Sequence, residues 1–336
     1  MYCPFGLCAL SVIFSESGCA NFEMMQFGKF MQKFRKIYES SQEYEYRLSV
    51  FSKNMKEAVR LQREELGTAQ YGVTQFSDLT AEEFRTNNLN IAMKLPHIKQ
   101  KTAVTSFPRD KDWRKNGVIS EVKNQGNCNS CWAFAAVGNI EAQWGIQGCP
   151  RNLSVQQIID CGPCDDGCRG GFTWDAYIAV QMQGTVGGLV SEEKYKYQAV
   201  RKDCRKGLSP AAWIHDFQML PKNETVMTSY VGNDGTLTVI INNALLQHYI
   251  KGIIHNVHKS CDPVNVNHVV LIVGYVRETK IPYWIVKNSY GTGRGEKGYF
   301  RMFHGKNMCG ITKYPLAAIV NFKKSKTIPC PPKGNI

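Results

Sequence analysis

The sequence predicts an α+β fold with a helical lobe and a β lobe, preceded by a separate helical segment. Three observations lead to this prediction. Apolar residues recur at helical spacing in residues 22–89, a Gly- and Cys-rich region with one clear helix follows Asp112, and strand-like runs fill the last third. The sequence contains no evident internal repeat or low-complexity segment.

The composition is that of a globular protein from an oxidising compartment. Its 336 residues are 43% hydrophobic, which is enough for two domains or for one domain with a pro-segment. Thirteen cysteines indicate several disulfides, and their odd number leaves at least one thiol over. The net charge of +13 is scattered along the chain. It therefore favours a solvated basic face, with anionic glycans as an alternative, and we expect no nucleic-acid partner.

The first residues resemble a secretory signal. Residues 1–14 are largely apolar but no Lys or Arg precedes them, so residues 1–20 are interpreted as a signal peptide, with the start of a buried helix as the alternative. No other run approaches the ~18 to 20 apolar residues of a membrane span. We expect a protein of the secretory pathway, in the lysosome, a granule, the endoplasmic reticulum or the extracellular space.

A helical segment covers residues 21–106 together with a linker. The two stripes of apolar residues in it have helical spacing, while residues 87–106 lose periodicity and contain Pro96 and several lysines. Such a linker is a good cleavage site, and we expect the cut near Thr105 to Lys111. The stripes comprise Phe27, Phe30, Phe34 and Ile37, then Leu48, Phe51, Met55 and Val59.

The remaining domain, residues 107–336, begins with a helix and ends with strands. The helix is expected from Cys131 to about Ile146 and is followed by cysteine-rich loops up to Gly171. The strands are expected over 236–241, 268–275 and 283–286, where apolar runs are bounded by Gly and Asn turns.

A reactive cysteine is predicted within QGNCNSCWAF, residues 125–134. Cys131 opens the helix, and the positive end of a helix dipole favours a thiolate. A nearby imidazole would complete its activation. His268 and Asn288 each lie at a strand end, although alone the first would be a core histidine and the second a turn former.

Six motifs in this order resemble the papain-like cysteine protease family, from about Phe27 to about Pro315. They are DWR at 112–114, QGNCNSCWAF, DCGPCDDGCRGG, NHVVLIVGY, YWIVKNSYG and GEKGYF. The resemblance implies a two-lobed fold, with a helical lobe and a β-barrel-like lobe, behind an inhibitory helical pro-domain. It also implies a monomeric cysteine-type endopeptidase that is made as a zymogen and needs no cofactor and no metal.

The resemblance assigns roles to particular residues. Cys131 would be the nucleophile, His268 its ion-pair partner and Asn288 the group that orients the imidazole. Gln125 would hold the oxyanion together with the backbone N–H of Cys131. Gly170 and Gly171 would line the cleft and allow an extended peptide to approach closely.

The resemblance also implies disulfides and partners. The implied pairs are Cys128 with Cys168, Cys161 with Cys204, and Cys261 with Cys309, while Cys330 is guessed to pair with Cys164 or Cys149. The partners would be a peptide or protein substrate, the chain's own pro-segment and cystatin-like inhibitors. Asn152 and Asn223 lie in short glycosylation patterns.

The pro-segment resembles the branch that contains cathepsins F and W. Residues Glu43, Arg47, Phe51 and Asn54 fit the family's interspersed pro-helix pattern. The next two positions hold Ala58 and Gln62, where most members carry Ile and Asn, and the stretch 71–84 also fits this branch.

Some residues depart from the family pattern. Tyr290 and Arg294 stand where tryptophans normally shield the histidine, Asn129 replaces a glycine, and CGITKYP is shortened. These changes leave open a catalytically weak or inactive relative that binds peptides or partners. The Cys-x-x-Cys spacings at 128–131 and 161–164 leave a zinc or redox dithiol as a further alternative.

Overall fold

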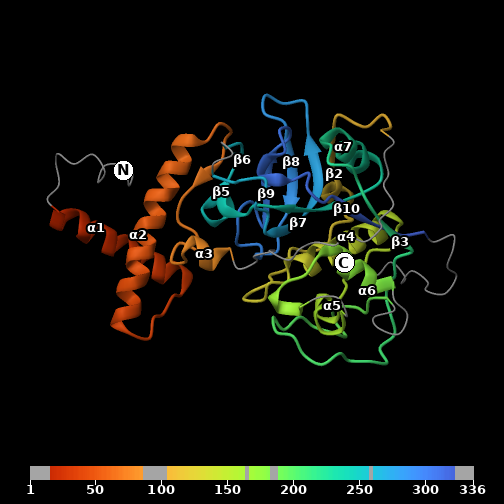
Figure 1. Ribbon diagram of the computed structural model, residues 1–336, viewed down its shortest axis with the longest axis horizontal. Helices are drawn as coiled ribbons and strands as arrows, with labels where there is room; N and C mark the ends of the chain where they lie inside the picture. Colours follow the sequence, from red (N-terminus) through yellow and green to blue (C-terminus); the bar gives the residue numbers. More distant parts are fainter. Residues whose placement is uncertain (1–15, 86–103, 163–165, 182–187, 257–259, 322–336) are drawn as a thin grey trace. The chain divides into compact units, whose positions relative to one another are not determined.

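The computed structural model describes residues 16–85, 104–162, 166–181, 188–256 and 260–321 (Figure 1). The chain forms two compact units. The first unit contains residues 1–86 and 243–261, and the second contains residues 87–242 and 262–336. Most of the predicted signal peptide, and residues 87–103 of the predicted linker, lie outside the described residues.

Helices form most of the first unit. They are α1 (Glu16–Phe34), α2 (Ser41–Glu64) and the short α3 (Ala81–Phe84), and Figure 1 shows α1 and α2 crossing. Phe27, Phe30, Phe51 and Met55 are buried together between α1 and α2, as their helical spacing predicts. The inclusion of Ile37 in this stripe was wrong. The helix ends at Phe34, Arg35 has a φ of 52°, and Ile37 is 89% exposed.

Polar residues of α2 tie this helix to the chain that follows it. Arg47 donates to the Glu83 carboxylate at 2.9 Å and to the Asp78 carbonyl at 3.0 Å. Nδ2 of Asn54 donates to the carbonyls of Ser77 and Leu79, at 2.8 and 2.7 Å. The interspersed pattern of the pro-helix therefore has a physical basis, because these side chains bind backbone and carboxylate groups of residues 77–83.

Residues 243–261 complete the first unit. They contain the 3-10 turn η4 (Ala244–Gln247) and the strands β5 (Tyr249–Lys251) and β6 (Ile253–Ile254). Strand β1 (Gln70–Tyr71) pairs antiparallel with β5. Gln62 supports β1 from α2, because its amide donates to the Ala69 carbonyl at 3.0 Å and accepts from the Tyr71 N–H at 3.1 Å.

The second unit combines helices with a mostly antiparallel sheet, which confirms the α+β prediction. Its strands run in the order β3-β10-β4-β7-β8-β9, and β2 pairs with β7. The predicted strands are confirmed as β4 (Leu237–Ile241), β7 (His268–Val276) and β8 (Tyr283–Lys287). The others are β2 (Asp110–Asp112), β3 (Asp216–Met219), β9 (Tyr299–Phe303) and β10 (Leu316–Ile319).

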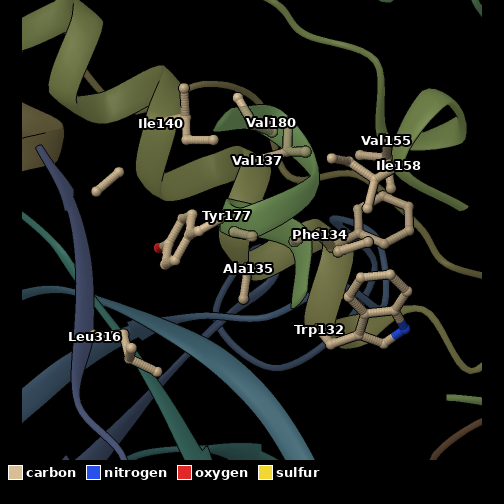
Figure 2. Packing of buried hydrophobic residues seen from close by; sticks show 14 of the residues in the cluster. Trp132, Phe134, Ala135, Val137, Ile140, Val155, Ile158, Tyr177, Val180 and Leu316 are labelled. Carbon is tan, nitrogen blue, oxygen red and sulfur yellow. The ribbon is translucent and has the colours of Figure 1, made fainter. Parts of the chain in front are cut away.

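Helix α4 (Cys131–Ile146) lies at the centre of this unit and has the predicted bounds. It is buried on all sides, and Figure 2 shows its residues Trp132, Phe134 and Ile140 packed among side chains of two further helices and of β10. Those helices are α5 (Val155–Cys161) and α6 (Thr173–Gln181), and α7 (Glu224–Asn233) follows later in the chain.

The expectation of loops alone between residues 147 and 171 was wrong. Helix α5 forms there because Oγ of Ser154 caps it by accepting from the Gln157 N–H at 3.0 Å. In the part of the second unit that the structure describes, the 3-10 turns are η2 (Trp113–Asn116), η3 (Gly167–Arg169) and η5 (Met308–Gly310). No helix in the described part of the chain is both long and apolar enough to cross a bilayer.

Candidate active site

Cys131 is the first residue of α4, with its thiol at the positive end of that helix. It is only 3% exposed, and the backbone N–H of Val269, on β7, points to its Sγ at 3.5 Å. The core packing of α4 fixes the position of this thiol, since the residues that follow Cys131 are buried. The structure therefore places Cys131 against the beginning of β7, next to His268.

His268 and Asn288 come from two neighbouring strands. His268 begins β7 and pairs with Ile241 of β4, while Asn288 directly follows β8. Nε2 of His268 lies 2.9 Å from Oδ1 of Asn288. The same oxygen accepts from the Ser289 N–H at 2.8 Å, so it is the acceptor and Nε2 carries a hydrogen. Nδ1 is thus the ring nitrogen that can accept a hydrogen bond when the imidazole is neutral.

Burial controls the charge of this histidine. His268 is 1% exposed, and desolvation lowers its pKa to about 4, although the hydrogen bond with Asn288 opposes this shift. A buried imidazolium therefore needs a negative partner nearby. The position of Cys131 beside β7 can supply one as the thiolate.

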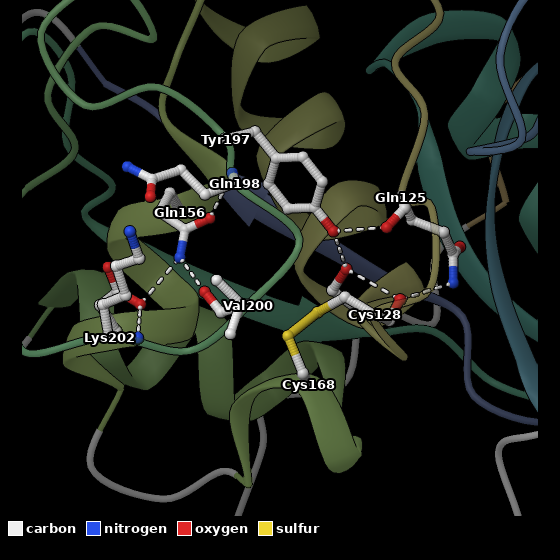
Figure 3. The surroundings of a disulfide bond; sticks show 10 residues. Gln125, Cys128, Gln156, Cys168, Tyr197, Gln198, Val200 and Lys202 are labelled. Carbon is white, nitrogen blue, oxygen red and sulfur yellow. Dashed lines mark hydrogen bonds between the residues drawn. A yellow bond between two sulfur atoms is a disulfide. The ribbon is translucent and has the colours of Figure 1, made fainter.

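Gln125 is buried beside the start of α4 and is held on three sides. Its Oε1 accepts from the Ser289 hydroxyl at 2.6 Å, and its backbone carbonyl accepts from the Tyr197 hydroxyl at 2.7 Å. One hydrogen of its Nε2 goes to the Cys128 carbonyl at 3.0 Å, so the amide has a second hydrogen to offer. Figure 3 shows the bonds of Gln125 with Tyr197 and with the Cys128 carbonyl, next to the Cys128–Cys168 disulfide.

The geometry agrees with a match to known families. Residues 107–319 match the model of the papain family cysteine proteases, and residues 27–84 match the cathepsin propeptide inhibitor domain. The chain belongs to the papain family of cysteine proteases. It is a cysteine peptidase with a propeptide, and hence a zymogen, which favours the protease over the non-enzymatic alternative.

Relatives of this papain-family chain include the cathepsins that the sequence resembles, and this confirms the predicted branch. Cathepsin W of Mus musculus is 43% identical, over 96% of this chain and 94% of that protein. Cathepsin F of Mus musculus is 40% identical, over 88% of this chain and 64% of that protein. Digestive procathepsin L 3 of Tenebrio molitor has a similar structure, with a TM-score of 0.76 and 29% identity over 89% of this chain and 99% of that one. The papain-like fold with its helical pro-domain is thereby confirmed.

Two disulfides of this papain-family domain join the pairs that the resemblance implies, Cys128 with Cys168 and Cys161 with Cys204. With Cys128 and Cys161 in disulfides, neither is available as a thiolate ligand for the alternative zinc site. Cys149, Cys261 and Cys309 are also disulfide-bonded, whereas Cys164 and Cys330 lie outside the described residues.

The structure also describes the remaining predicted residues. Gly170 has a φ of 133°, and a Cβ on Gly171 would lie 2.7 Å from the ring of Trp132, so a side chain at either position would be strained. The N–H of Asn129, which stands where the family has a glycine, donates to the Cys168 carbonyl at 3.0 Å. The two asparagines of the glycosylation patterns, Asn152 and Asn223, are both exposed.

Sequence analysis missed the residues that support the papain-family site from behind. Ser289 and Tyr197 hold Gln125, and only Ser289 has a local signal, its place beside Asn288. Lys287 is buried before Asn288, and desolvation lowers its pKa to about 8. Its Nζ donates to the Ser120 carbonyl at 2.7 Å, and the Ser120 hydroxyl in turn donates to Glu141 of α4. The sequence did not predict this cluster, because a lysine at the end of a strand has no motif that marks it as buried.

Proposed function

We propose that Cys131, His268, Asn288 and Gln125 form the catalytic machinery of this peptidase. The observation that carries the proposal is the geometry at the start of β7. Nε2 of His268 is held by Asn288 at 2.9 Å, and Sγ of Cys131 lies 3.5 Å from the next backbone nitrogen. In this proposal Asn288 orients the imidazole, Nδ1 of His268 acts as the base and Cys131 is the nucleophile.

The proposed reaction proceeds through a thioester. The Cys131 thiolate attacks the carbonyl carbon of an internal peptide bond, and a C–S bond forms. The C–N bond then breaks as Nδ1 of His268 gives its proton to the leaving amine. Water then attacks the thioester carbon while Nδ1 of His268 takes a proton from it, and the C–S bond breaks, which releases the acid product and restores the Cys131 thiolate and the His268 imidazolium.

Gln125 is proposed to stabilise the oxyanion of each tetrahedral intermediate. Its second Nε2 hydrogen and the backbone N–H of Cys131 are the two donors, and Ser289 keeps the amide oriented. The loss of one such donor typically costs about 3 to 4 kcal/mol of transition-state stabilisation.

The inhibitor domain over residues 27–84 supports a zymogen whose own pro-segment keeps it inactive. We propose that activation follows a cut near Thr105 to Lys111, where most side chains are exposed. The substrate would be an extended peptide or protein that lies along Gly170 and Gly171, and cystatin-like inhibitors would compete for the same site.

The cysteine-rich composition and the cathepsin relatives support a place in the secretory pathway, such as the lysosome, a granule, the endoplasmic reticulum or the extracellular space. We propose glycans at Asn152 and Asn223. A glycan at Asn223 is compatible with the cap of α7, because Oδ1 of this residue accepts from two backbone N–H groups and Nδ2 is the atom that carries sugar.

The test is to label the matured protein with an epoxide-bearing cysteine-protease probe at acidic and neutral pH. We expect labelling of the native protein and none of Cys131→Ala. Circular dichroism of both proteins controls for folding. A folded, processed protein that takes up no probe, or a variant that is labelled equally, would overturn the proposed role of Cys131.

A further inference from the structure

Tyr290 occupies a position against the catalytic histidine where the family usually has tryptophan. Its ring stacks on that of His268, with 4.9 Å between the ring centroids and 22° between the planes. The stack covers the imidazole, as an indole would. The phenol also brings a hydroxyl, which lies 3.5 Å from Nδ1 of His268.

The backbone on both sides fixes this tyrosine. The Ser289 carbonyl accepts from the Gln125 N–H at 2.9 Å, and the Gly291 N–H donates to the Lys123 carbonyl at 3.1 Å. Tyr290 itself forms a β-bridge with Asn124. The ring thus belongs to the same short ladder that positions Gln125, and its hydroxyl is held next to Nδ1.

We propose that the Tyr290 hydroxyl donates a hydrogen bond to Nδ1 of His268 whenever that ring is neutral, so that Tyr290 is a positioning residue that competes with Cys131 for this nitrogen. The inference rests on the proposed function of the two catalytic residues. Nε2 is held by Asn288 as a donor, so a neutral ring leaves Nδ1 as an acceptor. A phenol can donate to it, and the 3.5 Å separation is of the length that catalytic hydrogen bonds often have before substrate binds.

The chemical consequence has a definite sign. A hydrogen bond to the neutral imidazole stabilises the neutral form, which opposes the imidazolium of the ion pair. Within the described residues, the ring nitrogens contact Asn288 after β8 and the phenol itself, and the Cys131 thiol from α4 lies at the backbone nitrogen of the next residue, Val269. The ammonium of Lys287 is directed to Ser120 instead. The hydroxyl of Tyr290 therefore lowers the pKa of His268, so the imidazolium gives up its proton more readily.

The direct test measures the titration of His268 without the reaction. In the Cys131→Ala protein, the ring nitrogens are followed by ¹⁵N NMR over a pH series, with Tyr290 and with Tyr290→Phe. Phenylalanine keeps the stack and removes only the hydroxyl. Loss of one neutral hydrogen bond corresponds to about a two- to tenfold change in proton affinity, so we expect the pKa of His268 to rise by about 0.3 to 1 in the variant.

A matched control and a second variant make the outcome specific. Tyr283→Phe, on β8, removes another tyrosine hydroxyl and should leave the titration unchanged. In the active enzyme, kcat/KM is measured against pH. Tyr290→Phe should raise the apparent pKa of the alkaline limb by the same amount and leave that of the acidic limb unchanged. An unchanged His268 titration in Tyr290→Phe would overturn this inference, even where probe labelling upholds the proposed function. A folded, matured native protein that takes up no probe would overturn the proposed function instead.

Discussion

Individual hydrogen bonds decide how the proposed catalytic groups of this peptidase are held. The oxygen of Asn288 bonds both His268 and the backbone of Ser289, so the side chain serves the imidazole and the turn after β8. Asn288→Ala should lower kcat/KM by about 10- to 100-fold, as expected for a lost hydrogen bond to a charged group. Steady-state kinetics of the matured enzyme measures this, and Asn265→Ala, at an exposed position near the site in sequence, is the control. Unaltered kinetics of Asn288→Ala would contradict the assigned role.

Ser289 provides a second residue-scale prediction through Gln125. Ser289→Ala removes the 2.6 Å hydrogen bond to Oε1, which should lower kcat about two- to tenfold with little change in KM. In a double-mutant cycle, adding this change to Gln125→Ala should cost little more than Gln125→Ala alone. Full additivity of the two losses would show that the serine acts elsewhere.

The sequence motifs pointed to the proposed catalytic residues but not to the residues that support them. Cys131, His268 and Asn288 lie in short ordered motifs. The packing of α4, β7 and β8 brings these three residues together although they are far apart in the sequence. Tyr197 and Glu141 have no such motif, because their roles depend on which loops and helices meet in three dimensions. Likewise, Ile37 fitted a helical stripe, but the helix ended before it.

At the scale of elements, several polar side chains join α2 to the chain that follows it. Asn54→Ala removes a buried hydrogen bond to the Ser77 carbonyl and a partly buried one to the Leu79 carbonyl, and should destabilise the first unit by about 2 kcal/mol. The measurement is limited proteolysis of the Cys131→Ala zymogen with trypsin, and the pro-segment of Asn54→Ala should be cut faster. Gln42→Ala, at an exposed position of the same helix that is not a tryptic site, should behave like the parent. Equal cutting of all three proteins would contradict the prediction.

The molecule as a whole should respond to acid through a histidine of its first unit. His248 is 3% exposed, and burial lowers its pKa to about 4, opposed by the charge of Glu57 on α2. Above pH 6.5 the histidine is neutral in both folded and unfolded chains. Between about pH 6.5 and 4 only the unfolded chain takes up this proton. The free energy of unfolding therefore decreases as the pH is lowered, by about 3 kcal/mol in total.

Hydrogen exchange can test this acid response. The N–H of Gly72 donates to the His248 carbonyl at 2.9 Å, and its protection should decrease between pH 6.5 and 4 after correction for intrinsic exchange. His248→Gln should flatten this dependence. His255→Gln, at a partly exposed position of the same unit, should not. A pH dependence that survives in His248→Gln would assign the response to other groups.

The pairing of β1 with β5 has a consequence for the mature enzyme. Residues 249–251 reach the pro-segment as a ladder partner, so removal of the pro-segment turns them into an unpaired edge. Removal of the pro-segment therefore uncovers main-chain donors and acceptors along residues 249–251. An extended segment that pairs with residues 249–251 would replace the lost propeptide strand.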